Sequence, residues 1–219
     1  MPRLLFEKKG NAIWISHLDL MRVFQRSFKR AGLPLTHTQG FNPRPSVSIA
    51  LPLSVGIESS CELLDFDLDG EPIPEAEIKR RLNEKLVEGV RVLDVYTGGQ
   101  KIKYLALLDC CLTLQYDGGV PEGAAEKITA LLSREEVTVT KKSKSGNTEQ
   151  NIIPMIRKAA VRETNQNTLT VQARICCQNP SLNPMQIVFA IEKYLPECTP
   201  SFVECSRLEI YDQKEQQFR

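Results

Sequence analysis

The sequence predicts an α+β protein made of two ferredoxin-like halves in tandem, with antiparallel sheets and the helices on one face. Short runs in which apolar and polar residues alternate, as they do in strands, are separated by amphipathic runs with helical spacing. In the first half these runs follow the order β-α-β-β-α-β, which is the ferredoxin-like arrangement, and the second half is read as a looser copy of it. The segment Thr97-Gly98-Gly99-Gln100 is the best candidate boundary, so we expect halves at residues 1–97 and 98–219.

The first half opens with a strand at Leu4–Lys8 and a turn at Gly10-Asn11. A helix is expected to begin at Ser16, because Ser16 and Asp19 have the S-x-x-D spacing of a capping pair, and Gly32 closes it. At 100° per residue the helix has an apolar sector and an opposite basic sector. The apolar sector contains Leu20, Met21, Phe24, Phe28 and Ala31.

A hairpin and a second helix complete the first half. Strands are predicted at residues 47–53 and 64–68, where apolar residues alternate, with Gly56–Ser60 as the turn. Pro74 then precedes an amphipathic helix at Glu75–Glu88, and Val90–Tyr96 returns as a strand. Asp65, Asp67 and Asp69 share one face of their strand, where we expect them to meet solvent or to pair with cations of the first helix.

The second half repeats this order less clearly. Helices are predicted at Pro121–Leu132 and Asn183–Leu195, and Lys141–Gln150 is expected to be a mobile loop because Lys, Ser, Gly and Asn dominate it. Strands are predicted at Tyr104–Tyr116, Val137–Thr140, Ile152–Val161, Leu169–Cys176 and Val203–Tyr211.

The bulk composition is that of an ordinary globular protein. No apolar run approaches the roughly 20 residues that span a bilayer, and no secretory signal begins the chain, so we expect a cytoplasmic protein with no membrane partner. Seven cysteines, an odd number, favour reduced thiols over a disulfide framework. The vicinal pairs Cys110-Cys111 and Cys176-Cys177 lie in strand-like runs, and C-x-x-C is absent, so neither a metal site nor a cofactor is predicted.

Charge is sorted along the sequence. Residues 1–50 carry eight cations against two anions, a balance of +6 in a chain whose total is +1. Such sorting indicates a polyanionic partner, although a solvated helix face or an acidic protein surface would also account for it. Residues 51–100 carry five cations and eleven anions, a balance of −6 that would weaken this interpretation if the two stretches paired internally. The basic sector of the first helix contains Arg22, Arg26, Lys29 and Arg30.

Two further features of the first fifty residues are candidates for function. His17 occupies the first position of the predicted helix, where it could contact a phosphate, act as acid and base in RNA cleavage, or simply begin the helix. The loop Gln39–Pro45 is restricted by two prolines, and Gly40 allows a turn. It could hold outward an aromatic ring and a guanidinium, or it could bury the ring in the core. The candidate residues here are His37, Phe41, Asn42 and Arg44.

Several motifs carry a resemblance to a known family. They are His17-Leu18-Asp19-Leu20, the run from Lys29 to Leu35, Gly40-Phe41-Asn42-Pro43-Arg44-Pro45 and Leu51-Pro52-Leu53-Ser54-Val55-Gly56. The chain resembles the bacterial radical SAM-associated proteins of unknown function, which occur beside or fused to cobalamin-binding radical SAM proteins. That family usually has a histidine where this chain has Arg44. In organisation the chain is also similar to the CRISPR-type RAMP endoribonucleases, whose tandem ferredoxin-like halves often carry a histidine near the first helix.

These observations lead to three hypotheses. The preferred one is a non-catalytic adaptor that binds RNA or ribonucleoprotein through the basic helix and the loop. The family resemblance implies that it works with a radical SAM enzyme in RNA modification, and that the enzyme carries the cluster and cofactor. The first alternative is a metal-independent endoribonuclease with His17 as general acid or base, helped by Arg22, Arg26 or His37. The second is a protein-only docking partner of a radical SAM protein.

Overall fold

The computed structural model describes residues 1–143 and 146–219. It divides the chain into two compact units, Met1–Ile102 with Arg219, and Lys103–Phe218. In this described part of the chain no helix is both long and apolar enough to cross a membrane.

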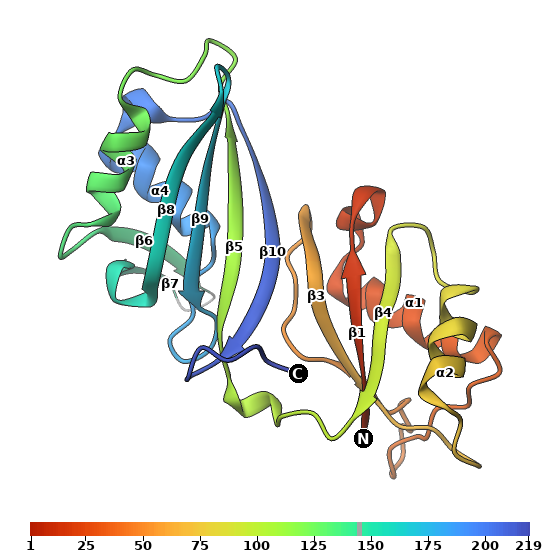
Figure 1. Ribbon diagram of the computed structural model, residues 1–219. Coiled ribbons are helices and arrows are strands. Elements are labelled where there is room, and N and C mark those ends of the chain that lie inside the picture. Colours follow the sequence, from red (N-terminus) through yellow and green to blue (C-terminus); the bar gives the residue numbers. More distant parts are fainter. Residues whose placement is uncertain (144–145) are drawn as a thin grey trace. The chain divides into compact units, whose positions relative to one another are not determined.

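The first unit is an antiparallel sheet with two helices (Figure 1). Its strands are β1 (Pro2–Lys8), β2 (Val47–Ile49), β3 (Ile57–Phe66) and β4 (Val90–Thr97), and its α-helices are α1 (His17–Arg30) and α2 (Glu75–Asn83). The strands lie in the order β4-β1-β3-β2. The predicted element order β-α-β-β-α-β is therefore confirmed for this unit.

Both helices of the first unit pack on one face of its sheet. Phe24 of α1 meets Phe6 of β1 with ring centroids 4.8 Å apart, and Phe28 meets Phe66 of β3 at 5.1 Å. Ile78 and Leu82 of α2 join the same buried cluster. The predicted apolar sector of α1 is confirmed, since Leu20, Phe24 and Phe28 are buried and Met21 and Ala31 pack partly buried against the cluster.

Two element boundaries of this unit differ from the predictions. The strand expected at residues 47–53 has only three residues, and most of the expected turn at Gly56–Ser60 belongs to β3. Pro52 has no N–H to donate to a ladder, which favours an early end of the strand. The helix expected at Glu75–Glu88 ends at Asn83, whose side-chain amide accepts a hydrogen bond from the N–H of Val92 and donates one to its carbonyl.

The second unit repeats the strand order of the first, with an added hairpin (Figure 1). Its sheet has the order β10-β5-β9-β8, all pairs antiparallel. Its strands are β5 (Leu105–Gln115), β6 (Thr138–Ser143), β7 (Gly146–Asn151), β8 (Ile156–Asn165), β9 (Thr168–Cys176) and β10 (Phe202–Asp212), and its α-helices are α3 (Ala124–Leu132) and α4 (Met185–Tyr194).

The added hairpin corrects one prediction. Strands β6 and β7 pair in register from Thr138↔Asn151 onward. The expected mobile loop at Lys141–Gln150 is therefore wrong for residues 141–143 and 146–150, and residues 144–145 lie outside the described part. The polar composition of the segment reflects exposure of β7, because a hairpin strand with one solvated face needs few apolar residues.

The cysteine side chains lie mostly inside the fold. Six of the seven thiols are buried, and Cys111 is half-buried. Burial raises the pKa of the Cys177 and Cys205 thiols to about 12, so both remain protonated at neutral pH.

A buried lysine fixes the start of α1. The Nζ of Lys8, which is 1% exposed, donates to the carbonyls of Ile13 at 3.1 Å and Ile15 at 2.8 Å, directly before the helix cap. These bonds hold the short 3₁₀ segment at Gly10–Trp14 against β1. Burial lowers the pKa of Lys8, and the carboxylate of Glu62, itself buried, opposes that shift.

We expect Lys8→Met to lower the free energy of unfolding by about 3 kcal/mol. The substitution leaves two carbonyls without their donor and removes the cation that faces buried Glu62. Urea unfolding followed by circular dichroism and by Trp14 fluorescence measures the change. The control is Lys9→Met, because Lys9 forms an ion pair with Glu7 at the surface and its loss should change stability by less than about 1 kcal/mol. Equal effects at both positions would contradict the role assigned to Lys8.

Candidate nucleic-acid interface

Helix α1 is capped at both ends by the residues that the sequence indicates. The Ser16 hydroxyl accepts a hydrogen bond from the N–H of Asp19 at 3.2 Å, so Ser16 is the N-cap. At the other end the N–H of Gly32 donates to Lys29 and the N–H of Leu33 donates to Phe28, which is the Schellman pattern. Gly32 has φ +66°, a value that favours glycine, and the chain reverses direction there.

The four cations of α1 are all exposed, and they differ in what they contact. Arg22 forms an ion pair with Asp19 at 2.7 Å. Arg30 donates to the carbonyl of Lys85 at 2.6 Å and to the Ser27 hydroxyl at 3.1 Å, so it ties α1 to the segment after α2. The side chains of Arg26 and Lys29 have no hydrogen bond or ion pair within residues 1–143 and 146–219. A carboxylate thus neutralises one of the four.

Several carboxylates of residues 51–100 bind partners outside α1. Glu77 pairs with Arg80 and Arg81 within α2, and the hydrogen bonds from these arginines lower the pKa of Glu77 to about 2. Asp65 pairs with Arg3 of β1 at 2.5 Å, and Asp67 accepts a hydrogen bond from Thr36. We expected these aspartates to meet solvent or to pair with cations of the first helix. Asp67 and Asp69 are exposed, as expected. The expectation is wrong for Asp65, which is half-buried and pairs with Arg3 because β3 lies beside β1.

The predicted loop is a small hairpin. His37 and Pro45 form an antiparallel bridge, the N–H of Thr38 donates to the carbonyl of Arg44, and the N–H of Ser46 donates to the carbonyl of Thr36. Further backbone bonds from Thr36 to Asp67 and from Asp67 to Ser46 anchor this hairpin beyond the end of β3. We call residues 36–46 the basic hairpin. Gly40 at its tip has φ +125°, as the predicted turn requires.

The tip of the basic hairpin projects into solvent. Phe41 has a relative exposure of 106%, so the alternative in which its ring is buried in the core is wrong. Asn42 and Arg44 are exposed as well, and the Arg44 guanidinium has no bonded partner within the described residues. An aromatic ring and a guanidinium are therefore presented together on one anchored ribbon.

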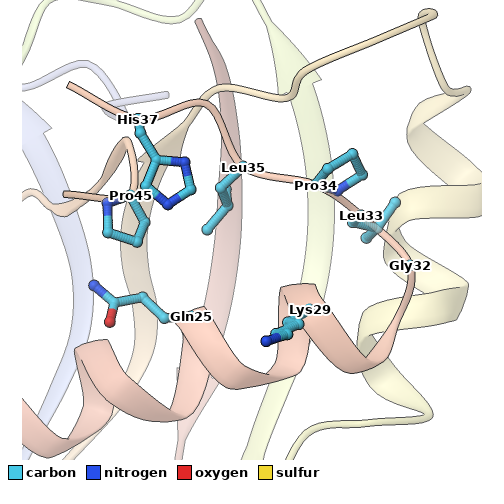
Figure 2. Close-up of a pocket in the computed structure, with 8 residues that line it drawn as sticks. All are labelled: Gln25, Lys29, Gly32, Leu33, Pro34, Leu35, His37 and Pro45. Atoms are coloured by element: carbon cyan, nitrogen blue, oxygen red, sulfur yellow. The ribbon is translucent and has the colours of Figure 1, made fainter. Parts of the chain in front are cut away.

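A cavity of about 440 Å³ lies between α1 and the base of the basic hairpin (Figure 2). After the reversal at Gly32, the chain runs back above α1, so that Leu35 and His37 face Gln25 and Lys29 across the cavity. The residues that line it are Gln25, Lys29, Gly32, Leu33, Pro34, Leu35, His37 and Pro45. The structure thus brings Lys29 and His37, two of the predicted residues, into one site.

His17 lies apart from that site. It is the first residue of α1, as predicted, and Gln25 lies more than two helical turns, about 12 Å along the axis, beyond it. The carboxylate of Asp19 occupies the same helix end, where the Ser16 hydroxyl and Arg22 donate to it and lower its pKa. A resident anion at this position disfavours a second one, so the predicted phosphate contact at His17 loses its electrostatic basis.

Sequence reasoning missed Gln25 and the apolar wall of the cavity. Gln25 and Lys29 are spaced i, i+4, so both lie on one side of α1, and this was the available signal. Pro45 was noted as a backbone constraint and a member of a family motif, and Pro34 only as a member of the run from Lys29 to Leu35. Within residues 1–143 and 146–219, no three His, Cys, Asp or Glu side chains lie close enough together to hold a metal ion.

Comparison with solved structures shows a fold likeness at very low identity. A chain in the crystal structure of a Cbf5-Nop10-Gar1 complex matches 95% of this chain with a TM-score of 0.54 at 10% identity, over 48% of its own length. Chains in an H/ACA RNP bound to a substrate RNA containing 2′-deoxyuridine and in an archaeal box H/ACA sRNP Nop10-Cbf5 complex give TM-scores of 0.49 and 0.48, each at 9% identity over 94% of this chain and 46% of theirs. The chain spans about half the length of these three solved chains.

The likeness establishes an α+β fold and no activity. No curated protein matches the sequence. A model of a family described as "uncharacterized protein conserved in bacteria", DUF2344, matches residues 2–184.

We expect Arg30→Gln and Arg26→Gln to differ in their effects on stability. Arg30 bonds a backbone carbonyl and a buried serine, so its loss should lower the free energy of unfolding by about 1 kcal/mol. Arg26 has no described partner, so its loss should change stability by less than about 0.5 kcal/mol. Urea unfolding of the two variants tests this, and a larger effect at Arg26 would show that it is part of the structural framework.

Proposed function

Because the chain belongs to DUF2344, a family of uncharacterized bacterial proteins, we propose its function from its own surface: it is a non-catalytic RNA- or ribonucleoprotein-binding adaptor. RNA would contact the outer face of α1 and the basic hairpin. In this proposal Arg26, Lys29 and Arg44 contact phosphates, Phe41 stacks on a base, and Asn42 and His37 lie beside them.

One observation carries the proposal. Arg26, Lys29 and Arg44 are exposed, and no carboxylate pairs with them in the described part of the chain. Neighbouring cations on a helix repel one another by a few tenths of a kcal/mol per pair, and a polyanion relieves that repulsion. Three carboxylates of residues 51–100, those of Asp65, Glu77 and Glu84, pair with Arg3, Arg80 and Arg81 instead.

The exposed ring of Phe41 adds a second kind of contact. A solvated phenyl ring at a hairpin tip buries no apolar surface in the folded chain, so its position gains nothing from folding. Stacking on an unpaired base contributes about 1 to 3 kcal/mol and tolerates any sequence. Together with Arg44 on the same hairpin, Phe41 favours unpaired or loop regions of RNA over a regular duplex.

The endoribonuclease alternative has less support. General acid and base catalysis needs two groups within reach of the same phosphodiester, and Lys29 and His37 lie over a different part of α1 from His17. Arg22, a proposed helper of His17, is engaged with Asp19. The similarity to RAMP endoribonucleases rests on element order, which does not transmit function.

We expect RNA affinity to fall steeply with salt, and the fall to depend on three side chains. In filter binding of a structured RNA with single-stranded loops, the slope of log affinity against log salt should lose about 2 to 3 in magnitude when Arg26, Lys29 and Arg44 are all replaced by Gln. The matched control replaces Arg91, Lys101 and Lys214, three other exposed cations, by Gln. Binding that does not respond to salt, or equal losses in both triple variants, would contradict the proposed interface.

The radical SAM partner of the proposal comes from the family resemblance. That resemblance implies a radical SAM protein encoded beside this chain, and we expect such a protein to co-purify with it after ribonuclease treatment, and to do so equally with the Arg26→Glu, Lys29→Glu variant. Loss of the complex in that variant would identify the basic face as a protein-docking surface, which is the protein-only alternative. Failure of the wild type to co-purify would remove the radical SAM partner.

A further inference from the structure

The cavity beside α1 has two kinds of wall. One is apolar and is made by the Leu33 to Leu35 segment and the ring of Pro45. The other is polar and is made by the Gln25 amide, the Lys29 amine and the His37 imidazole, which come from two separate segments (Figure 2). An apolar pocket with a few converging polar groups is the usual form of a small-ligand site.

We propose that this cavity holds one unstacked nucleobase of the bound RNA; the inference rests on the proposed function and assigns it a recognition pocket. The base would lie against Leu35, Pro45 and the His37 ring. The Gln25 amide would bond the base edge, and Lys29 would face the attached phosphate.

The size of the cavity fits this occupant. A volume of about 440 Å³ is near the lower end of the range of roughly 300 to 1,000 Å³ for small-molecule sites, so it accommodates a single nucleotide and not a helix of RNA. Single-stranded RNA is read by splaying bases out, stacking them on flat side chains that include histidine, and bonding their edges. A Gln side chain offers both an acceptor oxygen and two donor hydrogens, which suits base edges.

The groups around the cavity suggest different contacts for the phosphates and for the base of a bound RNA strand. Lys29 belongs both to the basic face of α1 and to the cavity, so it joins the two surfaces. His37 and Pro45 form the bridge at the base of the basic hairpin, whose tip carries Phe41. A strand that follows α1 and then the hairpin would pass the mouth of the cavity between them. The cavity is therefore placed to select one base while the exposed cations supply affinity for any strand.

The chain contains two histidines, which gives a direct assay. Proton NMR of the histidine rings, assigned with His17→Gln and His37→Gln, should show the His37 signal moving saturably with at least one of AMP, GMP, CMP and UMP. Ribose 5-phosphate should move it much less, and the His17 signal should stay still because it lies away from the cavity. We expect Gln25→Ala to weaken the preferred mononucleotide about five- to tenfold, and Gln166→Ala, at an exposed glutamine of the other unit, to leave it unchanged.

The same variants separate this inference from the proposed function. Suppose that RNA binds in a salt-dependent way, but that no mononucleotide shifts the His37 NMR signal more than ribose 5-phosphate does. If Gln25→Ala also leaves the affinities for the four RNA homopolymers unchanged, the base pocket is overturned and the RNA adaptor stands. A changed order of the four homopolymers in Gln25→Ala would support the pocket. If mononucleotides bind but RNA does not, both the RNA adaptor and its recognition pocket fail.

Discussion

The docking of α1 on its sheet decides which of its two faces meets solvent. Phe24 and Phe28 are fully buried against Phe6 and Phe66, and burial of each ring is worth about 1.5 to 3 kcal/mol. Repulsion among the cations on the opposite face is only a few tenths of a kcal/mol per pair. The free energy gained by burying the rings therefore exceeds the repulsion among the cations. Folding leaves the basic face of α1 exposed although the crowding of its cations is unfavourable.

Ion pairing in the first unit follows proximity in the sheet and along each helix. Within α2 and just after it, Arg80 forms ion pairs with Glu77 and Glu84 at helical spacing, and Arg81 pairs with Glu77. Arg3 of β1 pairs with Asp65 of the neighbouring strand β3. The −6 balance of residues 51–100 thus cancels the charge of residues 1–50 in the total but not at the surface of α1. A net charge near zero can hide a strongly basic patch, because solvent and distance screen charges that do not touch.

Helix α1 could be predicted because its signals lie within the helix itself. The cavity beside it could not, because it is formed by segments that are distant in the sequence. The Ser16 cap, the apolar sector and Gly32 act within one helix, and the structure has all three as predicted. The basic hairpin depends on Thr36 meeting Asp67, and the cavity depends on the chain turning back above Gln25. The spacing of apolar residues along the sequence does not indicate contacts between such distant segments. The β6–β7 hairpin was missed for a related reason, since its polar strand lacks the alternation by which strands are recognised.

The separation of His17 from the cavity bears on whether this surface binds or catalyses. A catalytic pair must converge within hydrogen-bond reach of one reacting atom, whereas a binding surface needs only charges and rings spaced along a strand. Here the cations are spread along α1 and a hairpin, and the polar groups that do converge, Gln25, Lys29 and His37, surround an apolar wall. Apolar walls favour the face of a base and do nothing for the charge that develops in phosphodiester cleavage. The arrangement therefore fits the proposed RNA-binding adaptor better than the endoribonuclease alternative.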